Sequence, residues 1–495
     1  MTARTRSAVD LRAAVPALLG IGVLAAGLVA LGDLTGLPPA VPLTALVLVA
    51  VAALVVATRG VDALGVGLLV GAVATVPWNA VVFAGLKPGP VMLALALLLL
   101  GTRALVLRRR VVVPAWVWVL GGTITVVALA TLVHPPSPGY LAARFVPAEL
   151  VAHTEAGWPG LVTAIGWLVA AVALPLTVCL AAPLRPGLPG RLASAWALGA
   201  AVSAAVALTD DAGLTHVSLR LRGLVDVGGR EAGLTVQPTH LAVATALALP
   251  VVVWRLTRVR TAWPAAGWAA AGLVMVGGLV VSESRGGLVA AVAAVLVTLA
   301  LRRRSRPWLA PLAVLAAAVA VVVVVSAPDL VGGAAERLRL AGADSAAMSN
   351  QVREQLGAQA WADFAHAPVQ GIGLEVAVQG HNIWLQLLAA GGALLLLGFL
   401  ATAALVAADV AVLGGAAKRS PTVELRRAGS GLPLVMAISA ATWLLVGTVE
   451  NHLTDLYLYV PFAVIAGMRA LSPTRSTDTE AIPTGLAASS GGVRP

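Results

Sequence analysis

Three arginines and one histidine have types and placements that suggest a shared chemistry: Arg230, Arg285, Arg353 and His381. Arginine carries a permanent charge on a planar fork of N–H donors. Two or three arginines can therefore bind a diphosphate and stabilise the charge that grows on it as a leaving group. A histidine with a pKa near neutrality can take a proton from an attacking hydroxyl. Together these residues predict glycosyl transfer from a lipid diphosphate, with inversion at the anomeric carbon and no covalent sugar–enzyme step.

Arg353 and His381 belong to the stretch 349–392, the longest polar interruption in an otherwise apolar sequence. Its first part predicts an amphipathic helix, because apolar residues recur at three- and four-residue spacing: Val352, Leu356, Ala360, Trp361 and Phe364. Pro368 ends this helix, which is too short to span a bilayer. Gly371 and Gly373 then permit a tight turn before His381 and Asn382 begin the next apolar run. Arg353 and His381 should therefore flank a pocket at the membrane surface.

The composition predicts a polytopic membrane protein. The 495 residues are 59% hydrophobic and 11% charged, and the mean hydropathy is +0.94, which leaves too little polar surface for a soluble globule. The formal net charge of +11 would suggest nucleic acid in a soluble protein. Here the basic residues form short clusters between apolar runs, so they indicate topology instead. The single cysteine, Cys179, excludes an intramolecular disulfide and is predicted to be an inert core residue.

Apolar runs of sufficient length predict fourteen membrane spans, and the runs between 63 and 107 and the long run at 381–412 are the hardest to divide. The predicted spans lie near 14–32, 40–58, 63–83, 90–107, 111–133, 161–181, 192–208, 235–253, 262–282, 286–301, 308–326, 381–412, 431–449 and 455–472. Placing both termini in the cytoplasm puts 24 of the 33 lysines and arginines inside. The nine outside are Lys87, Arg144, Arg220, Arg222, Arg230, Arg285, Arg337, Arg339 and Arg353.

Each candidate residue also has a structural interpretation. Arg285 could snorkel to phospholipid headgroups, although the neighbouring Gly286 and Gly287 favour close helix packing at a functional site. Arg220, Arg222 and Arg353 could be solvated positions of a loop or an amphipathic helix. His381 could be an interfacial residue bonded to a carbonyl, but Asn382 beside it, and Trp384 one turn on, favour a site.

Other polar residues are weaker candidates. Asp210 and Asp211 lack a third metal ligand at a suitable spacing. His240 could pack within a span, and His366 could complement a helix dipole. A final group comprises Glu450, Asn451, His452 and Asp455. These residues could line the acceptor site or form only a polar turn, and the turn is the favoured interpretation.

The order of these motifs resembles the O-antigen ligase family, which includes bacterial O-antigen polymerases and related protein O-glycosyltransferases. The shared pattern is an Arg opening an amphipathic helix, a Pro-x-x-Gly-x-Gly turn at 368–373, and His-Asn-x-x-Leu at 381–385 entering a membrane helix. Two upstream pieces agree: Ser284-Arg285-Gly286-Gly287, and Arg230-Glu231-Ala232-Gly233 followed by Pro238-Thr239-His240-Leu241-Ala242. The resemblance covers roughly residues 225–412.

This resemblance implies an activity and a site. Such proteins take a glycan from undecaprenyl diphosphate at the extracytoplasmic face and join it to lipid A core, another repeat unit or a protein hydroxyl, without a metal or other cofactor. Arg230, Arg285 and Arg353 match the family's basic positions, and His381 matches its histidine. Asn382, Trp384 and Glu450 are expected near the acceptor. The sequence has Thr239 where an Asn after the proline is common, and its outer loop at 327–380 is modest; both differences concern the acceptor.

The resulting expectation is an all-α integral membrane protein of a bacterial plasma membrane, a polytopic GT-C-like bundle of 12–14 transmembrane helices. Residues 1–208 would be scaffold, 209–472 the catalytic region with its larger extracytoplasmic loop at 327–380, and 473–495 a disordered cytoplasmic tail. Its partners would be a polyprenyl-diphosphate glycan, a hydroxyl acceptor and the bilayer, with no nucleic acid. The alternative is a transporter or flippase for a lipid-linked glycan. The lack of an internal repeat and the gathering of candidate residues at one face argue against it.

Overall fold

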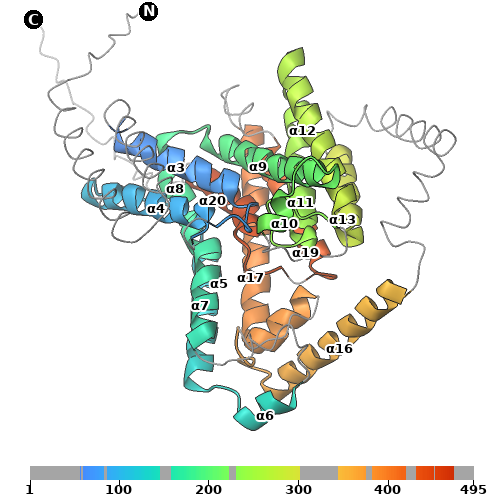
Figure 1. Cartoon of the computed structure of the whole chain (residues 1–495). Coiled ribbons are helices and arrows are strands. Elements are labelled where there is room, and N and C mark those ends of the chain that lie inside the picture. The colour runs from blue at the N-terminus through green and yellow to red at the C-terminus, as the bar shows by residue number, and fades with distance from the viewer. Residues whose placement is uncertain are drawn as a thin grey trace, which may run out of the picture.

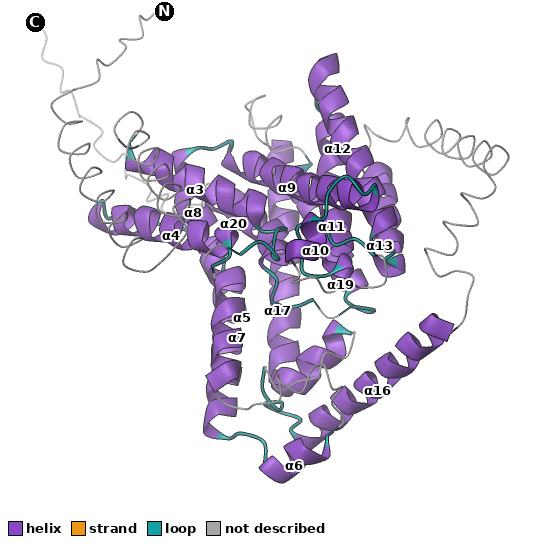
Figure 2. Cartoon of the chain, in the orientation of Figure 1, coloured by secondary structure: helices purple, strands orange, loops and turns teal. Residues whose placement is uncertain are grey.

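The computed structural model describes residues 56, 60–82, 86–144, 158–221, 230–301, 344–374, 382–419, 431–450 and 452–472. These residues are mostly helical and contain no β-strand, which confirms the predicted all-α class (Figure 2). The elements are α3 Val61–Thr75, α4 Pro88–Val106, α5 Ala115–Val133, α6 Pro138–Ala143, α7 Trp158–Leu168, η2 Val169–Ala173, α8 Leu174–Ala181, η3 Ala182–Leu184, α9 Leu188–Asp211, α10 Val217–Leu221, α11 Pro238–Leu256, α12 Ala262–Val281, α13 Arg285–Leu301, α16 Asp344–His366, α17 Ile383–Arg419, α19 Leu432–Val446, η5 Leu456–Tyr459 and α20 Val460–Ala470.

Among the described residues, seven helical stretches are long and apolar enough to cross a membrane, and four shorter apolar helices accompany them. These eleven correspond to eleven of the fourteen predicted spans. The predicted spans near 14–32 and 308–326, and nearly all of 40–58, lie outside the described residues, as do the predicted tail and the first part of the outer loop. The first of the eleven ends at Thr75, well before residue 83. Val76 still has helical dihedral angles, but Pro77 after it has no N–H with which to continue the helix.

α11 is the central helix of the bundle (Figure 1). It packs against α9, α12, α13 and α19. In its most apolar stretch, 72% of the residues are buried inside the protein, against 22% in α4, α12 and α17. Small residues allow the close approach: a Cβ added to Gly287 of α13 would lie 2.4 Å from the Ala242 Cβ of α11. The prediction that Gly286 and Gly287 permit close helix packing is therefore confirmed for Gly287. The N-terminus of α11 and the N-terminus of α13 are held side by side as a result.

The long run beginning at Ile383 is not one straight helix. Gly392 has φ 61° and ψ −159°, a conformation that a side chain disfavours, and it divides α17 into two arms. The rings of Trp384 and Phe399 are 6.1 Å apart, whereas fifteen residues of straight helix would separate them by about 22 Å. The arms therefore fold back on each other. The sequence pattern could not show this, because both arms are continuously apolar.

The turn at 368–373 completes the backbone hydrogen bonds that this break exposes. Ile372 and Gly373 donate their N–H groups to the carbonyls of Ala389 and Ala390, at the end of the first arm, at 2.9 and 3.1 Å. Two amides of the second arm, at 393 and 394, donate to carbonyls at 368 and 369 at 2.8 and 3.2 Å. The tight turn predicted from the glycines is present, with Gly371 at φ 69° and Gly373 at φ 113°. Its structural role is to cap both arms of α17.

Candidate functional site

The turn that follows α19, residues Gly447–Glu450, is where several distant segments of the chain meet; we call it the α19 turn. Ile383 donates its N–H to the Gly447 carbonyl at 2.7 Å, and Asn382 Nδ2 donates to the Thr448 carbonyl at 3.3 Å. Asn382 Oδ1 also accepts from the backbone N–H groups of Trp384 and Leu385 at 2.9 and 3.2 Å, as an N-cap residue does. Asn382 thus fixes the start of α17 against the α19 turn.

Arg353 of α16 approaches the same turn from the other side. Its Nη2 lies 3.9 Å from Glu450 Oε1, and the Glu450 side chain is only 7% exposed. Arg353 itself is 38% exposed, and its Nε is buried without a hydrogen-bond partner among the described atoms. A buried guanidinium N–H without a partner is unfavourable unless a ligand or water satisfies it. The Arg353 fork therefore has binding capacity beyond Glu450.

Arg285 begins α13 beside the α19 turn. A Cβ added to Gly286, the next residue, would lie 3.2 Å from the Val449 side chain and 4.0 Å from Glu450 Oε1. Ser284 Oγ accepts the N–H of Gly287 at 3.3 Å and so caps the helix that Arg285 opens. The link from α12 is only Ser282–Ser284, with Glu283 at φ 52°. This short link places Arg285 where α12 ends and α13 begins, between the predicted spans at 262–282 and 286–301.

Arg230 reaches the same link from the segment that precedes α11. Its Nε donates to the Ser282 carbonyl at 3.1 Å, and the N–H of Glu231 donates to the Val281 carbonyl at 3.0 Å. The segment is anchored on its other side by Leu234, whose N–H donates to Ser203 Oγ at 3.0 Å. The three predicted arginines therefore lie around the α12–α13 link and the α19 turn, although they come from three separate parts of the chain: the segment before α11, the start of α13, and α16.

A comparison with known protein families gives a match for part of the chain. Residues 270–400 match the O-antigen ligase family, a range that includes Arg285, Arg353, His381, Asn382 and Trp384. This region of the chain belongs to that family. The match supports, in general terms, a membrane glycosyltransferase of the O-antigen ligase and polymerase type. No curated protein matches the chain.

Of the residues predicted at 381–384 in the O-antigen ligase region, the structure describes Asn382 and Trp384. His381 lies outside the described residues, but its neighbour Asn382 is bonded to the α19 turn. Trp384 packs its ring edge-on against Phe399 and joins the hydrophobic core. The Trp384 side chain therefore stabilises the fold-back of α17 in this structure, and its predicted contact with an acceptor stays a prediction.

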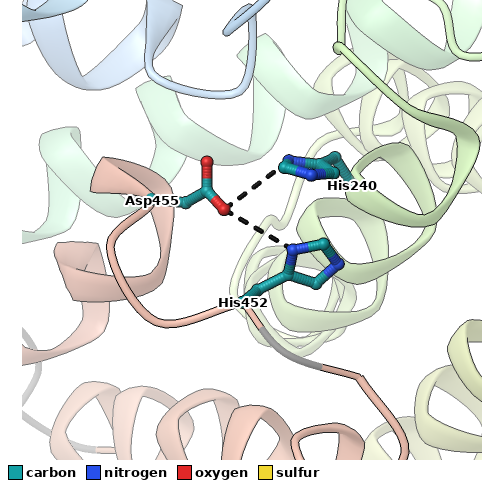
Figure 3. A group of neighbouring side chains, drawn as sticks. All are labelled: His240, His452 and Asp455. Carbon is teal, nitrogen blue, oxygen red and sulfur yellow. Dashed lines mark ion pairs between the residues drawn. The ribbon is translucent and has the colours of Figure 1, made fainter. Parts of the chain in front are cut away.

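A largely buried polar network lies next to the α19 turn (Figure 3). It brings together His240, His452 and Asp455, which the sequence pattern did not link. Nδ1 of His240 and Nδ1 of His452 each lie 3.6 Å from the same carboxylate oxygen, Asp455 Oδ2. The two imidazole rings are 4.1 Å apart in an edge-on arrangement. The sequence gives no signal for this contact, because His240 begins α11 and lies more than 200 residues before the other two.

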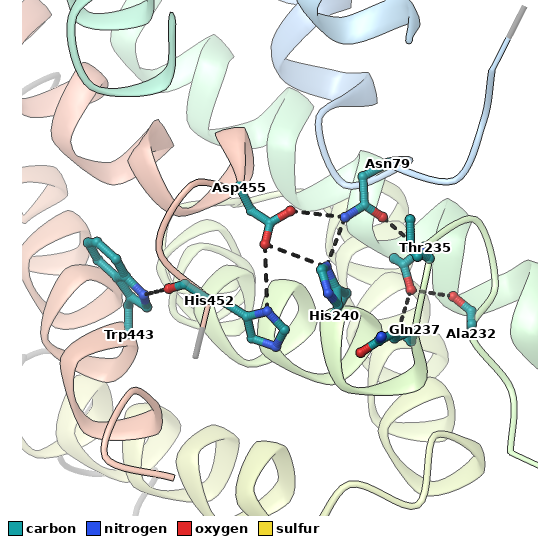
Figure 4. A network of polar contacts seen from close by, with 9 residues as sticks. Asn79, Ala232, Thr235, Gln237, His240, Trp443, His452 and Asp455 are labelled. Carbon is teal, nitrogen blue, oxygen red and sulfur yellow. Dashed lines mark hydrogen bonds and ion pairs between the residues drawn. The ribbon is translucent and has the colours of Figure 1, made fainter. Parts of the chain in front are cut away.

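Asn79 completes this network from the segment after α3 (Figure 4). Its Oδ1 accepts the N–H of Val236 at 2.9 Å, which fixes Nδ2 as the donor to Asp455 Oδ1 at 3.1 Å and to His240 Nδ1 at 2.8 Å. His240, His452 and Asp455 have ligand atoms within 4.8 Å of one another and are the group of described residues that could hold a metal ion. Because the Asn79 amide takes the lone pair of His240 Nδ1, the geometry favours a hydrogen-bonded network over metal ligation.

The electrostatics of this network follow from its burial. Burial lowers the pKa of His452, and the neighbouring His240 adds to this effect against the opposing influence of Asp455. Burial alone would raise the pKa of Asp455, but His240 and His452 hold it well below its usual range. Asp455 is therefore a carboxylate at neutral pH, and His452 is a neutral imidazole. The turn predicted at 450–455 is thus also the junction of α3, α11 and α20.

Asp210, which the sequence analysis weighed as half of a metal site, has a structural role. Its two carboxylate oxygens accept the backbone N–H groups of Val217 and Ser218, at 2.9 and 2.6 Å. Asp210 thus caps the N-terminus of the short helix α10, because its carboxylate accepts hydrogen bonds from the first backbone N–H groups of that helix.

Proposed function

We propose that this protein transfers a glycan from a polyprenyl diphosphate, such as undecaprenyl diphosphate, to a hydroxyl acceptor at the extracytoplasmic face of a bacterial plasma membrane. The observation that carries the proposal is the convergence of Arg230, Arg285 and Arg353 on the α12–α13 link and the α19 turn. Guanidinium groups that meet from separate elements can bind both phosphates of a diphosphate and stabilise the departing charge. The residues of the family match, 270–400, include two of the three arginines and His381.

In this proposal, His381 is the general base. Asn382 anchors the start of α17 to Thr448, two residues before Glu450, and His381 directly precedes Asn382 in the sequence. Removal of the acceptor proton by His381 would let the hydroxyl attack the anomeric carbon directly and invert its configuration. Glu450 holds the Arg353 guanidinium beside the turn through their 3.9 Å contact. The reaction needs no metal in this scheme, because the arginines supply the positive charge.

An apolar pocket offers a site for a short part of the donor's prenyl tail, the rest of which would lie among the lipids. It is lined by residues of α5, α17, α19 and α20, among them Phe399, Thr402 and Trp443. The polar atoms of these side chains are already bonded: Thr402 Oγ1 to the Gly398 carbonyl at 2.8 Å, and Trp443 Nε1 to the His452 carbonyl at 2.8 Å. The pocket therefore presents hydrocarbon, and α19 leads from it to the α19 turn. A tail in this pocket would place its diphosphate toward the arginines.

Purified protein in nanodiscs tests the proposal. A polyprenyl-diphosphate glycan is supplied with a panel of hydroxyl acceptors, and free polyprenyl diphosphate and the new glycosidic linkage are both measured. We expect release of polyprenyl diphosphate, an inverted linkage and full activity in EDTA. The same protein is also reconstituted in vesicles. Donor that crosses the vesicle membrane unchanged, with no release for any acceptor in either system, would instead identify a flippase.

A further inference from the structure

A buried ion pair joins the end of α6 to the C-terminal half of α16, the helix that also carries Arg353. Arg144 Nε and Nη2 donate to Asp363 Oδ1 and Oδ2 at 2.8 and 2.6 Å, and both side chains are at most 1% exposed. Tyr140 Oη and Gln359 Nε2 each donate to Asp363 Oδ1 at 2.9 Å. Four donors thus satisfy one carboxylate, which is the arrangement in which a buried charge is favourable. We call these four residues the α6–α16 clamp.

Packing around the clamp strengthens it. The Tyr140 ring stacks on His366 with centroids 3.7 Å apart and planes 4° from parallel. Ala367 and Ile372 form a small apolar cluster with Tyr140 and Leu141. Burial raises the pKa of Tyr140 to about 12, and the Asp363 carboxylate adds to this effect, so the phenol stays protonated and donates. Figure 1 shows α6 against one end of α16, at the periphery of the molecule.

The clamp and Arg353 share one face of α16. Arg353, Leu356, Ala360 and Asp363 follow one another at spacings of three, four and three residues, which places them on a single stripe of a helix. Leu356 and Ala360 are buried between the two polar ends of this stripe. Asp363 lies ten residues from Arg353, about 15 Å along the axis. Fixing Asp363 therefore fixes the rotation of α16, and with it the direction in which Arg353 leaves the helix.

We propose that Arg144 and Asp363 are positioning residues, which hold α16 so that Arg353 faces Glu450 and the donor diphosphate. Neither residue touches the α19 turn, and both act through the rigid helix between Asp363 and Arg353. This inference rests on the proposed function for the role of Arg353. The arrangement of α16 itself does not depend on that function, so the two can be tested separately.

The first measurement reports geometry without activity. Cysteines placed by Arg353→Cys and Glu450→Cys are bridged with a short bis-maleimide, while the native Cys179 is buried and reacts slowly. Asp363→Asn keeps the shape of the side chain and removes its charge. We expect it to lower the yield of the 353–450 bridge at least threefold. Tyr140→Phe removes one donor and keeps the ring stacked on His366, so it provides a milder variant with a smaller decrease should Asp363→Asn fold poorly.

The second measurement is kinetic and uses Arg353 and Glu450 intact. Asp363→Asn and Arg144→Lys should raise KM for the lipid-diphosphate donor about tenfold or more and change kcat less, because misplacing a binding group weakens binding of the donor. The exchanged pair Arg144→Asp with Asp363→Arg should recover part of the loss. Asp62→Asn is the control, since Asp62 of α3 also pairs with an arginine, Arg103 of α4, at 2.7 Å, but the two side chains are partly exposed. This variant should leave both readouts unchanged.

The outcomes separate the two proposals. If Asp363→Asn and Tyr140→Phe both fold and leave the 353–450 bridge and KM at wild-type values, the clamp does not position Arg353. If the bridge yield falls but wild-type protein releases no polyprenyl diphosphate, the clamp stands as an element that orients α16 and the glycosyltransferase proposal fails. A drop in thermal stability with unchanged KM and unchanged bridging in the folded fraction would mark the clamp as a structural tie only.

Discussion

Replacing Gly392 by alanine should destabilise the protein strongly, because this glycine makes the fold-back of α17. Its φ of 61° and ψ of −159° lie in a region that is essentially restricted to glycine, and a side chain there costs about 1–3 kcal/mol. The added Cβ would also lie 2.4 Å from the backbone carbonyl carbon and oxygen of Val369, which cannot rotate away. Such overpacking costs about 1–3 kcal/mol more. We therefore expect a loss of about 2–6 kcal/mol in the free energy of unfolding, the sum of the two effects.

Reversible unfolding in mixed micelles measures this loss. Gly414→Ala is the matched control, because Gly414 lies in the second arm of α17 and a Cβ there would meet nothing within 4 Å. The control should be neutral or stabilising by about 0.5–1 kcal/mol, since alanine is the better helix former. A Gly392→Ala protein as stable as the control would refute the folded-back geometry of α17. It would also remove the explanation of how Asn382 is held at the α19 turn.

Three further predictions concern protonation, catalysis and topology. Because the pKa of His452 is lowered in the folded protein, the unfolded chain binds more protons than the folded one between that pKa and about 6.5, and the free energy of unfolding should fall as the pH drops below about 6.5. The slope is at most about 1.4 kcal/mol per pH unit, and His452→Asn should flatten it. An unchanged slope in this variant would show that His452 is not the cause. His381→Ala should slow glycan transfer by about 10²–10⁴-fold at unchanged donor binding, whereas full activity with a working acceptor would exclude His381 as the base. A cysteine at Ala343 should react with an impermeant maleimide in intact cells and one at Arg304 should not, and the reverse pattern would invert the predicted topology.

Much of the fold follows from the sequence because a bilayer allows few solutions for an apolar run. Continuous hydrophobicity predicted eleven helices that the structure contains, and the short Val281–Arg285 interval predicted the tight link between α12 and α13. The break at Gly392 was not predicted, since apolar residues continue on both sides and a glycine within a helix does not by itself indicate a bend. The break depends on the turn at 368–373, whose backbone completes the hydrogen bonds of both arms of α17.

The candidate site was predictable in part for a similar reason. Nine basic residues on the predicted outer face violate the charge bias of the remaining chain, and the resemblance to the O-antigen ligase family selected Arg230, Arg285 and Arg353 from these nine. The structure brings all three to neighbouring elements. The network of Asn79, His240, His452 and Asp455 was not predicted, because each residue alone resembles an ordinary polar residue at a helix end. Only tertiary packing places them within bonding range.

Arg144 shows the limit of charge counting. It is one of the nine arginines and lysines predicted outside, as is Arg353, so charge counting alone does not distinguish the two. The Arg144 guanidinium is nevertheless buried, and its Nε and Nη2 are bonded to the two carboxylate oxygens of Asp363. A partner more than 200 residues away decides between a binding role and a structural one. Such long-range pairs cannot be inferred from one sequence.

Binding of a labelled polyprenyl-diphosphate glycan to the protein in nanodiscs tests the central claim most directly. Wild-type protein is titrated beside Arg285→Lys, Arg353→Lys and the control Arg220→Lys, whose side chain lies exposed on α10. Lysine keeps the charge and loses the bidentate fork. We predict that each site variant weakens binding by about tenfold or more, that the control binds like wild type, and that a monophosphate donor binds weakly to all four. Equal affinity of wild type and both site variants for the diphosphate donor would contradict the assignment of these arginines to the diphosphate.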